Sequence, residues 1–237
     1  MTLVRLLANL GYGSRREVET LLRRRQVHGP DGVPLRASAA DPGGPLWVAG
    51  EPLDPRAPLV LLLHKPAGFV CTASEDEGPT VLSLLPPRFA RRRPVLATVG
   101  RLDKDSSGLL LLTDDGALLH HLTSPRHAVE KVYRATLARD LAGAEAQALA
   151  TGELLLRGEE RPLRPARVEV LGPREVRVAV TEGRYHLVRR MWAALGNHVQ
   201  TLHRERMGSL DLAGLNEGSW RVLEPAEQAQ LRGAAAD

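Results

Sequence analysis

Short apolar runs separated by turn residues are the feature that most limits how this chain can fold. Five of them have the length and aliphatic content of strands: Leu59–Leu63, Leu109–Leu112, Val132–Leu137, Ala166–Val170 and Val176–Val180. Four further segments are predicted to be helices: Thr80–Leu85, Ala117–Thr123, Ala144–Ala150 and His186–Leu195. Because strands outnumber helices and do not alternate strictly with them, we predict an α+β domain with a mixed, largely antiparallel sheet flanked by helices.

The sequence also indicates the cellular location of the protein. None of the apolar runs approaches the roughly 18 apolar residues that a membrane-spanning helix needs. The first residues, MTLVRLLANLGYG, lack the long apolar segment and cleavage site of a signal peptide. A single cysteine, Cys71, excludes an internal disulfide and is typical of a reducing compartment. We therefore predict a cytoplasmic protein.

A change of composition divides the chain. Residues 37–58 are rich in proline, glycine, aspartate and alanine, which is typical of a boundary. It separates a small N-terminal module, residues 1–55, from a larger one, residues 56–237. A chain of 237 residues is long enough for two unequal domains of this kind.

The small module is predicted to consist of two helices and a short ribbon. LVRLLANLG predicts a helix that ends at Gly11, and Ser14 with Glu17 forms a capping box before a second helix. A Gly-Pro-Asp-Gly turn at residues 29–32 predicts a hairpin. A solvated face or a surface for RNA or DNA would both explain the arginines on the second helix. These arginines are Arg15, Arg16, Arg23, Arg24 and Arg25.

Arginine supplies nearly all of the basic charge. Of 32 lysines and arginines only Lys65, Lys104 and Lys131 are lysines, and the formal net charge is +4. A coding bias towards G and C explains most of this excess, so only the places where arginines cluster count as evidence. The run RRR at residues 91–93 is one such place, and it is either an exposed loop or a second contact for phosphates.

GRLDKDSSGLLLLTDDG, at residues 100–116, places Asp103 between Arg101 and Lys104, ahead of a leucine run. A calcium loop counted from Asp103 matches poorly, because position 12 is Asp114 and the preceding leucines should form a buried strand. A plain turn accounts for the serines that follow, but not for Asp103. A catalytic carboxylate accounts for Asp103, because nearby cations favour its ionised form and a buried strand fixes the loop.

Four long motifs resemble the RNA pseudouridine synthases, in the RsuA branch that modifies small-subunit ribosomal RNA. They are HKPAGFVCT at 64–72, the loop at 100–116, LTSPRHAVEKVYRATL at 122–137 and EGRYHLVRRMWAALGNHVQTLHRERMGSL at 182–210. The N-terminal module resembles the S4 RNA-binding domain that these enzymes carry. The motifs stand in the family's order, and the resemblance covers essentially the whole chain.

The resemblance implies isomerisation of uridine to pseudouridine within RNA, with no cofactor and no metal ion. Asp103 matches the essential aspartate, which either attacks C1′ or takes the 2′ proton. Tyr133 matches the tyrosine that stacks on the uracil, and Arg189 matches the basic residue paired with the carboxylate. Val188 matches an apolar residue that packs on the base, and Arg101 belongs to the motif that keeps the nucleotide flipped out.

Partners follow from the same resemblance. Small-subunit ribosomal RNA, naked or in an assembly intermediate, is the expected substrate of a monomeric enzyme, and Arg15, Arg16, Arg23 and Arg24 are expected to bind it. Large-subunit ribosomal RNA is the alternative target. A non-catalytic RNA-binding or ribosome-assembly factor is the alternative function. Leu187 stands where the family usually has glutamine, which removes an amide near the site.

Overall fold

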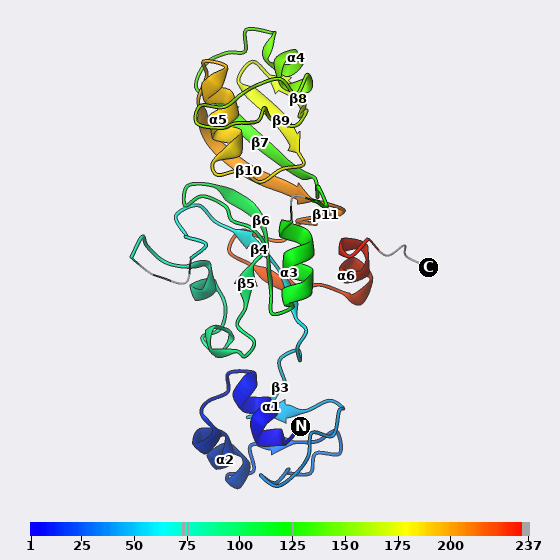
Figure 1. Ribbon diagram of the computed structural model, residues 1–237. Coiled ribbons are helices and arrows are strands. Elements are labelled where there is room, and N and C mark those ends of the chain that lie inside the picture. The colour runs from blue at the N-terminus through cyan, green and yellow to red at the C-terminus, as the bar shows by residue number, and fades with distance from the viewer. Residues whose placement is uncertain (73, 75, 125, 234–237) are drawn as a thin grey trace. The chain divides into compact units, whose positions relative to one another are not determined.

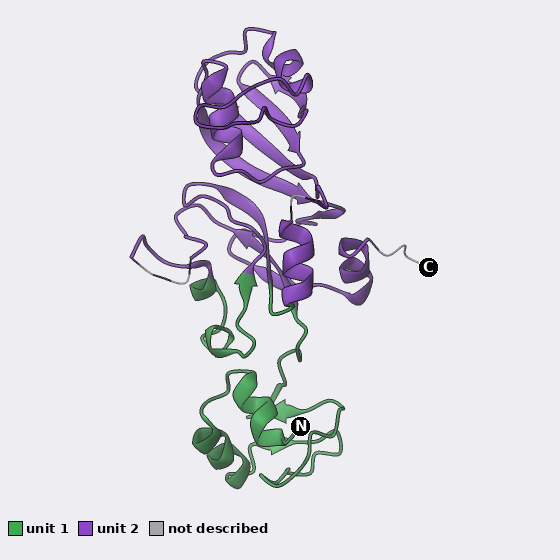
Figure 2. Ribbon diagram, viewed as in Figure 1, with its two compact units in different colours: residues 1–59, 82–97, 113–115 green, residues 60–81, 98–112, 116–237 purple. Residues whose placement is uncertain are grey.

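The computed structural model describes residues 1–72, 74, 76–124 and 126–233 (Figure 1). Pro125 of the third motif and the last four residues of the chain lie outside this part. The chain forms two compact units, which Figure 2 shows in different colours. The first unit consists of residues 1–59, 82–97 and 113–115, and the second consists of residues 60–81, 98–112 and 116–237.

The first unit includes two segments from beyond the predicted domain boundary. Arg93 N donates to Asn9 O at 2.7 Å, and Arg88 forms an ion pair with Asp54. Asp54 N donates to Tyr12 Oη at 3.0 Å. These contacts join residues far apart in sequence, so local composition carries no sign of them. The division into domains 1–55 and 56–237 stays a prediction.

Helices α1 (Leu3–Asn9) and α2 (Arg15–Arg23) begin the first unit. The predicted capping box is confirmed at the start of α2. Glu17 N donates to Ser14 Oγ at 3.3 Å, and Ser14 N donates to Glu17 Oε2 at 2.7 Å. Val18 and Leu22 of α2 are buried in a small core shared with α1 and the ribbon. The arginine side of α2 is therefore left to solvent.

The ribbon is three-stranded and antiparallel, in the order β1 (Val27–His28), β2 (Trp47–Val48) and β3 (Glu51–Pro52). The predicted hairpin partner of β1 is joined to it by a single bridge, between His28 and Pro34. Proline has no N–H group and cannot extend the ladder. Two backbone hydrogen bonds nevertheless flank the bridge, from Gly29 N to Val33 O at 3.1 Å and from Leu35 N to Val27 O at 2.9 Å, so the predicted hairpin is confirmed, and β1 also pairs with β2.

A nine-stranded sheet is the framework of the second unit (Figure 1). Seven strands follow in the order β12 (Trp220–Val222), β4 (Val60–Lys65), β6 (Ser107–Thr113), β10 (Val199–Met207), β7 (Lys131–Leu137), β9 (Glu175–Val180) and β8 (Arg167–Gly172). The short strands β5 (Ala97–Thr98) and β11 (Leu210–Asp211) pair with β6 and β10. Strand β10 runs parallel to β6 and antiparallel to β7, so the sheet is mixed, as predicted.

All five predicted strands are present, but the central strand β10 is not among them. Its sequence, VQTLHRERM, reads as polar rather than as an apolar run. Only the pairing with β6 on one side and β7 on the other makes it a strand of the sheet interior. The signal that marks a central strand in a sequence is therefore missing here.

Four helices accompany the sheet: α3 (Gly116–Thr123), α4 (Glu145–Ala150), α5 (Leu187–Ala194) and α6 (Pro225–Leu231). Helices α4 and α5 share one core with β7 and β9, and α3 and α6 share another with β4 and β6 (Figure 1). Three predicted helices are confirmed, whereas residues 80–85 contain only a short 3₁₀ helix, Val81–Leu84. Pro79 and Pro86 limit its length. No helix in the described part of the chain is long and apolar enough to cross a bilayer.

Strands β6 and β10 approach each other closely at Gly108. A Cβ atom there would lie 2.3 Å from Arg204 O, and the φ angle of Gly108 is +112°. Only glycine satisfies both conditions without strain. The loop that ends at β6 is thereby brought against the middle of β10, where Arg204 lies.

His203 on β10 is expected to make the stability of this sheet depend on pH. Its Nδ1 lies 2.9 Å from Ser107 Oγ, and burial, together with the neighbouring His64, lowers its pKa from the ordinary value of 6.5. Below that value the unfolded chain takes up a proton that the folded chain does not. We expect the free energy of unfolding to fall as the pH drops through about 6.5.

Urea titrations about one pH unit above and below that value measure this effect. The His203→Asn variant keeps a polar group near Ser107 but cannot titrate in this range. Its stability should therefore depend less steeply on pH than that of the wild type. An equally steep dependence in the variant would assign the effect to another group.

Candidate active site

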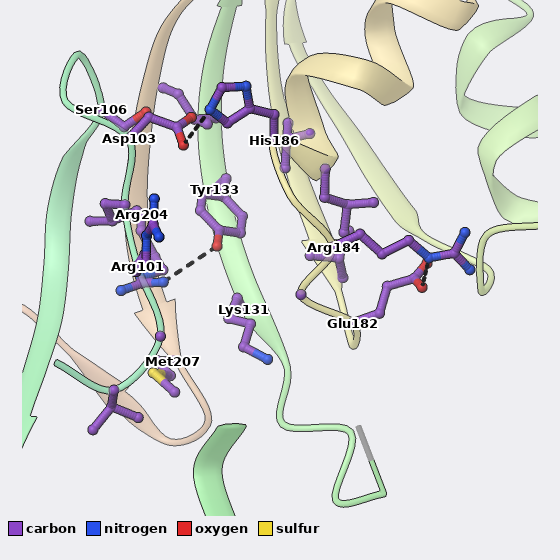
Figure 3. A pocket seen from close by; sticks show the side chains of 18 of the residues that line it. Arg101, Asp103, Ser106, Lys131, Tyr133, Glu182, Arg184, His186, Arg204 and Met207 are labelled. Carbon is purple, nitrogen blue, oxygen red and sulfur yellow. Dashed lines mark hydrogen bonds and ion pairs between the residues drawn. The ribbon is translucent and has the colours of Figure 1, made fainter. Parts of the chain in front are cut away.

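A cavity of about 220 Å³ lies between the loop before β6, strands β7 and β10 and the start of α5. Asp103 and Arg101 reach it from the loop, Tyr133 from β7 and Arg204 from β10 (Figure 3). Val188 lines it from α5. Four residues that the sequence motifs singled out, from segments far apart in the chain, therefore meet in one place.

The carboxylate of Asp103 is held on both sides. Arg189 Nε lies 3.3 Å from Oδ2, and His186 Nε2 lies 3.2 Å from Oδ1. The Arg189 side chain is fixed in turn, because Nη1 donates to Val199 O at 3.0 Å and Nη2 pairs with Asp105 at 2.9 Å. The side chain of Asp103 remains 25% exposed. A fixed but accessible carboxylate can contact a substrate in a defined position.

The two cations beside Asp103 in sequence do not hold its carboxylate. Lys104 Nζ donates to Glu77 O at 2.5 Å, and the exposed Arg101 side chain lines the cavity. The expectation that these neighbours pair with the carboxylate is therefore wrong. The ion pair comes instead from Arg189, as the resemblance implied, and His186 Nε2 contacts the other carboxylate oxygen.

His186 was missed, although it lies in a quoted motif. It precedes α5 with φ +49°, a conformation that is unfavourable for most side chains. Strained backbone of this kind gathers at functional sites. Leu187, the departure from the family pattern, also lines the cavity and is buried in the core of α5. It contributes an apolar wall where an amide was expected.

Lys65 on β4 holds the backbone of the loop that carries Asp103. Its side chain is fully buried, and Nζ donates to the carbonyl oxygens of Pro66 (3.0 Å), Asp103 (3.1 Å), Lys104 (3.4 Å) and Ser106 (2.6 Å). Burial lowers the pKa of this ammonium, because desolvation disfavours the charged form, while nearby negative groups act in the opposite direction. Its place in the HKPAGF motif was the only sequence signal for this role.

Arg204 supports Tyr133 within the cavity (Figure 3). Its Nη1 lies 3.5 Å from Tyr133 Oη, and its guanidinium carbon is 6.0 Å from the centre of the ring. Arg204 is buried, and its Nε donates to Leu109 O at 2.6 Å. The tyrosine ring is half-buried and free to present a face to the cavity. Sequence reasoning missed Arg204 because β10 itself was not predicted.

The arginines predicted to bind RNA through the small module lie in the first unit. One of them lines a depression of about 330 Å³ together with Arg91 and Arg93. An exposed arginine face suits phosphate contacts. The binding of RNA by this face stays a prediction. All four are exposed: Arg15, Arg16, Arg23 and Arg24.

Arg92 is the buried member of the RRR run, whereas Arg91 and Arg93 are exposed, and phosphate binding by those two stays a prediction. The buried guanidinium of Arg92 pairs with Asp114 at 3.3 Å and donates to Pro55 O at 2.9 Å, so it cannot reach RNA. Asp114 also accepts from Leu59 N at 2.6 Å. Asp114, which would be the twelfth position of a calcium loop, is therefore already bound to Arg92 and Leu59 N. No group of His, Cys, Asp and Glu in the described residues could hold a metal ion.

Comparison with known proteins agrees with this geometry. The family described as RNA pseudouridylate synthase matches residues 59–194, and the chain belongs to that family. The ribosomal small subunit pseudouridine synthase A of Escherichia coli (strain K12) is 44% identical over 184 residues, 77% of this chain and 78% of that one. The protein of the same name from Pasteurella multocida (strain Pm70) is 45% identical over 168 residues, 70% of this chain and 71% of that one.

A solved structure extends the similarity to nearly the full length. The crystal structure of a pseudouridylate synthase covers 98% of this chain and 99% of that chain, with a TM-score of 0.69 and 35% identity. The resemblance to the RsuA branch is thereby confirmed, as is the pseudouridine synthase fold with its mixed sheet and flanking helices. The chain is an isomerase that converts uridine to pseudouridine in RNA.

Proposed function

We propose that this enzyme modifies small-subunit ribosomal RNA, and that Asp103 is its catalytic carboxylate. The names of relatives at 44–45% identity support the target. One observation above all supports the carboxylate: Asp103 is accessible from the cavity while Arg189 and His186 each hold one of its oxygens. A group with this placement can react at the sugar of a bound nucleotide.

In the proposed reaction the target uridine leaves its stack, which costs a few kcal/mol. The base enters the cavity between Tyr133 and Val188, and stacking on the ring returns about 1–3 kcal/mol. Asp103 then either attacks C1′ or takes the 2′ proton to give a glycal, and the C1′–N1 bond breaks. The base turns and C5 bonds to C1′; this displaces Asp103 in the first case, and in the second case Asp103 returns its proton to C2′. C5 then releases its proton with help from Tyr133, and N1 gains a proton. Substrate and product are isomers, so the balance needs no redox partner.

The remaining residues are proposed to bind and position the RNA. Residues 1–55 are proposed to form an S4-like RNA-binding domain, in which Arg15, Arg16, Arg23 and Arg24 contact phosphates and so position the strand without reading bases. Arg101 keeps the flipped nucleotide out of the helix. One chain supplies every side chain named here, so the proposal requires no second copy.

Tritium release from ribosomal RNA transcripts labelled at C5 of uridine tests the reaction and the target together. We expect release from the small-subunit transcript, or from an assembly intermediate that contains it, and none from the large-subunit transcript. Release from the large-subunit transcript alone would move the target to that RNA. Binding without release from any of these substrates would support a non-catalytic RNA-binding factor.

A further inference from the structure

A second cavity, of about 310 Å³, adjoins the first at Asp103. Arg101, Leu102, Asp103 and His186 line both cavities, so the carboxylate stands at the boundary between them. The uridine proposed above fills only the first cavity. A group in the second cavity would therefore lie next to the reacting sugar.

Tyr185 presents an aromatic ring at this second cavity. It is 69% exposed, the highest value among the large hydrophobic side chains of the described residues. One face of its ring stacks on His186, with the ring centres 3.8 Å apart and an angle of 18° between the planes. His186 contacts Asp103 on one side and the Tyr185 ring on the other, so the second face of the Tyr185 ring is available close to the carboxylate. Every nucleic-acid base has a face that can stack on such a ring.

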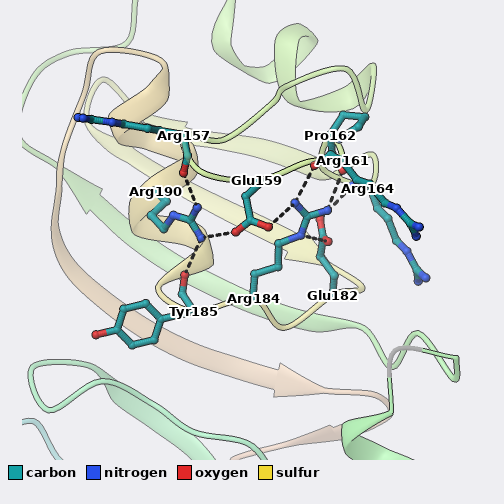
Figure 4. Close-up of polar contacts among 9 residues, drawn as sticks. All are labelled: Arg157, Glu159, Arg161, Pro162, Arg164, Glu182, Arg184, Tyr185 and Arg190. Carbon is teal, nitrogen blue, oxygen red and sulfur yellow. Dashed lines mark hydrogen bonds and ion pairs between the residues drawn. The ribbon is translucent and has the colours of Figure 1, made fainter.

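The backbone beneath Tyr185 is fixed by a network of ion pairs (Figure 4). Tyr185 O accepts from Arg190 Nη1 at 3.3 Å, and Glu159 pairs with the same guanidinium at 2.7 Å. Arg184 pairs with Glu159 at 3.4 Å and with Glu182 at 2.8 Å. The ring itself extends away from this network (Figure 4). A ring on a fixed backbone loses little freedom when a ligand stacks on it.

The charges at the boundary suit a phosphate group. Arg101 is exposed and lines both cavities, and Lys104 lines the second. Two exposed carboxylates line the second cavity as well, on Asp105 and Glu77, and that of Asp105 is paired with Arg189 at 2.9 Å. The phosphate that joins two successive nucleotides would have to pass from one cavity to the other. Arg101 lies at that crossing, and its planar guanidinium can contact two phosphate oxygens at once.

We propose that the second cavity binds the nucleotide next to the target uridine in the same RNA strand. Its base stacks on the open face of Tyr185, and the phosphate between the two nucleotides lies at Arg101. This inference rests on the proposed function, because it takes the first cavity to hold the target uridine. The subsite replaces part of the stacking that the strand loses when the uridine is flipped out.

Single-turnover tritium release from a short ribosomal RNA fragment tests the subsite. Three fragments are compared: one is intact, one is abasic at the nucleotide before the target, and one is abasic at the nucleotide after it. For wild type, one of the two abasic fragments should raise the half-saturating RNA concentration about 5- to 100-fold, the effect of one lost stack. Tyr185→Leu should cause a loss of the same size with intact RNA, and the abasic site should add nothing further. Tyr185→Phe, which keeps the ring, should behave as wild type.

Val170→Ala is the matched control, because Val170 is an exposed apolar residue that lines neither cavity. It should leave both the rate and the half-saturating concentration unchanged. If Tyr185 only braces His186, Tyr185→Leu will lower the saturated rate, and both abasic fragments will bind wild type normally; that result overturns the subsite. The wild-type arm decides the question even if Tyr185→Leu folds poorly. Failure of wild type to release tritium from any transcript counts against the proposed function instead.

Discussion

The Asp103→Asn variant is expected to lose tritium release by at least about 10³-fold while it keeps its affinity for RNA. The amide has the size of the carboxylate and fits between Arg189 and His186, so the fold and the RNA surface are preserved. It has no charge, and it can neither attack C1′ nor take the 2′ proton. Single-turnover release at saturating RNA measures the rate, and equilibrium binding of the same RNA measures the affinity.

Asp105→Asn is the matched control for this loss. Asp105 also pairs with Arg189, but its side chain is 67% exposed. Removing its charge should change the rate far less, because it lies outside the first cavity. Equal losses in the two variants would mean that the charge around Arg189 matters and that neither carboxylate reacts. Wild-type turnover in Asp103→Asn would remove Asp103 from the mechanism.

The Lys65→Met variant is expected to be destabilised by about 3 kcal/mol, because buried carbonyl oxygens of the catalytic loop lose their shared donor. Methionine fills most of the space but donates nothing. The loop that carries Asp103 should shift, and a displacement near 1 Å costs turnover on the order of 10²-fold. Urea unfolding measures the stability, and single-turnover release at a temperature where the variant is folded measures the rate.

Lys104→Met tests whether the effect belongs to the buried ammonium. Lys104 follows Asp103 directly, but it is exposed, and its ammonium donates to Glu77 O. Its loss should change stability by less than about 0.5 kcal/mol, as for most surface substitutions. A Lys65→Met enzyme as stable and as active as Lys104→Met would show that the loop keeps its shape without Lys65.

Much of the fold was accessible from sequence because its signals are local. The apolar runs predicted all five strands, and the serine and glutamate of the capping box predicted the start of α2. Two of the failures share one cause, which is contact with partners far away in the chain. Strand β10 is polar along its length and becomes central only by pairing with β6 and β7. Residues 82–97 pack into the first unit through partners far away in the chain.

The candidate site divides in the same way. Motif resemblance named Asp103, Tyr133, Val188 and Arg189, and three of these line one cavity while the fourth pairs with Asp103. No motif assigned a role to His186, to Arg204 or to Lys65, which donates to the carbonyl oxygens of the loop. Each of these acts by reaching a group from another segment of the chain, and a residue's own neighbours in sequence do not reveal such a contact.

By itself, the sequence determined five strands of the sheet, the family of the enzyme and the aspartate on which its chemistry is proposed to depend. Only the tertiary structure decided which side chains hold that aspartate. The sequence neighbours Arg101 and Lys104 are aimed elsewhere, whereas Arg189 and His186 arrive from a segment more than eighty residues away. The physical reason is that an ion pair depends on distance in space, and the pairing of β6 with β10 sets that distance.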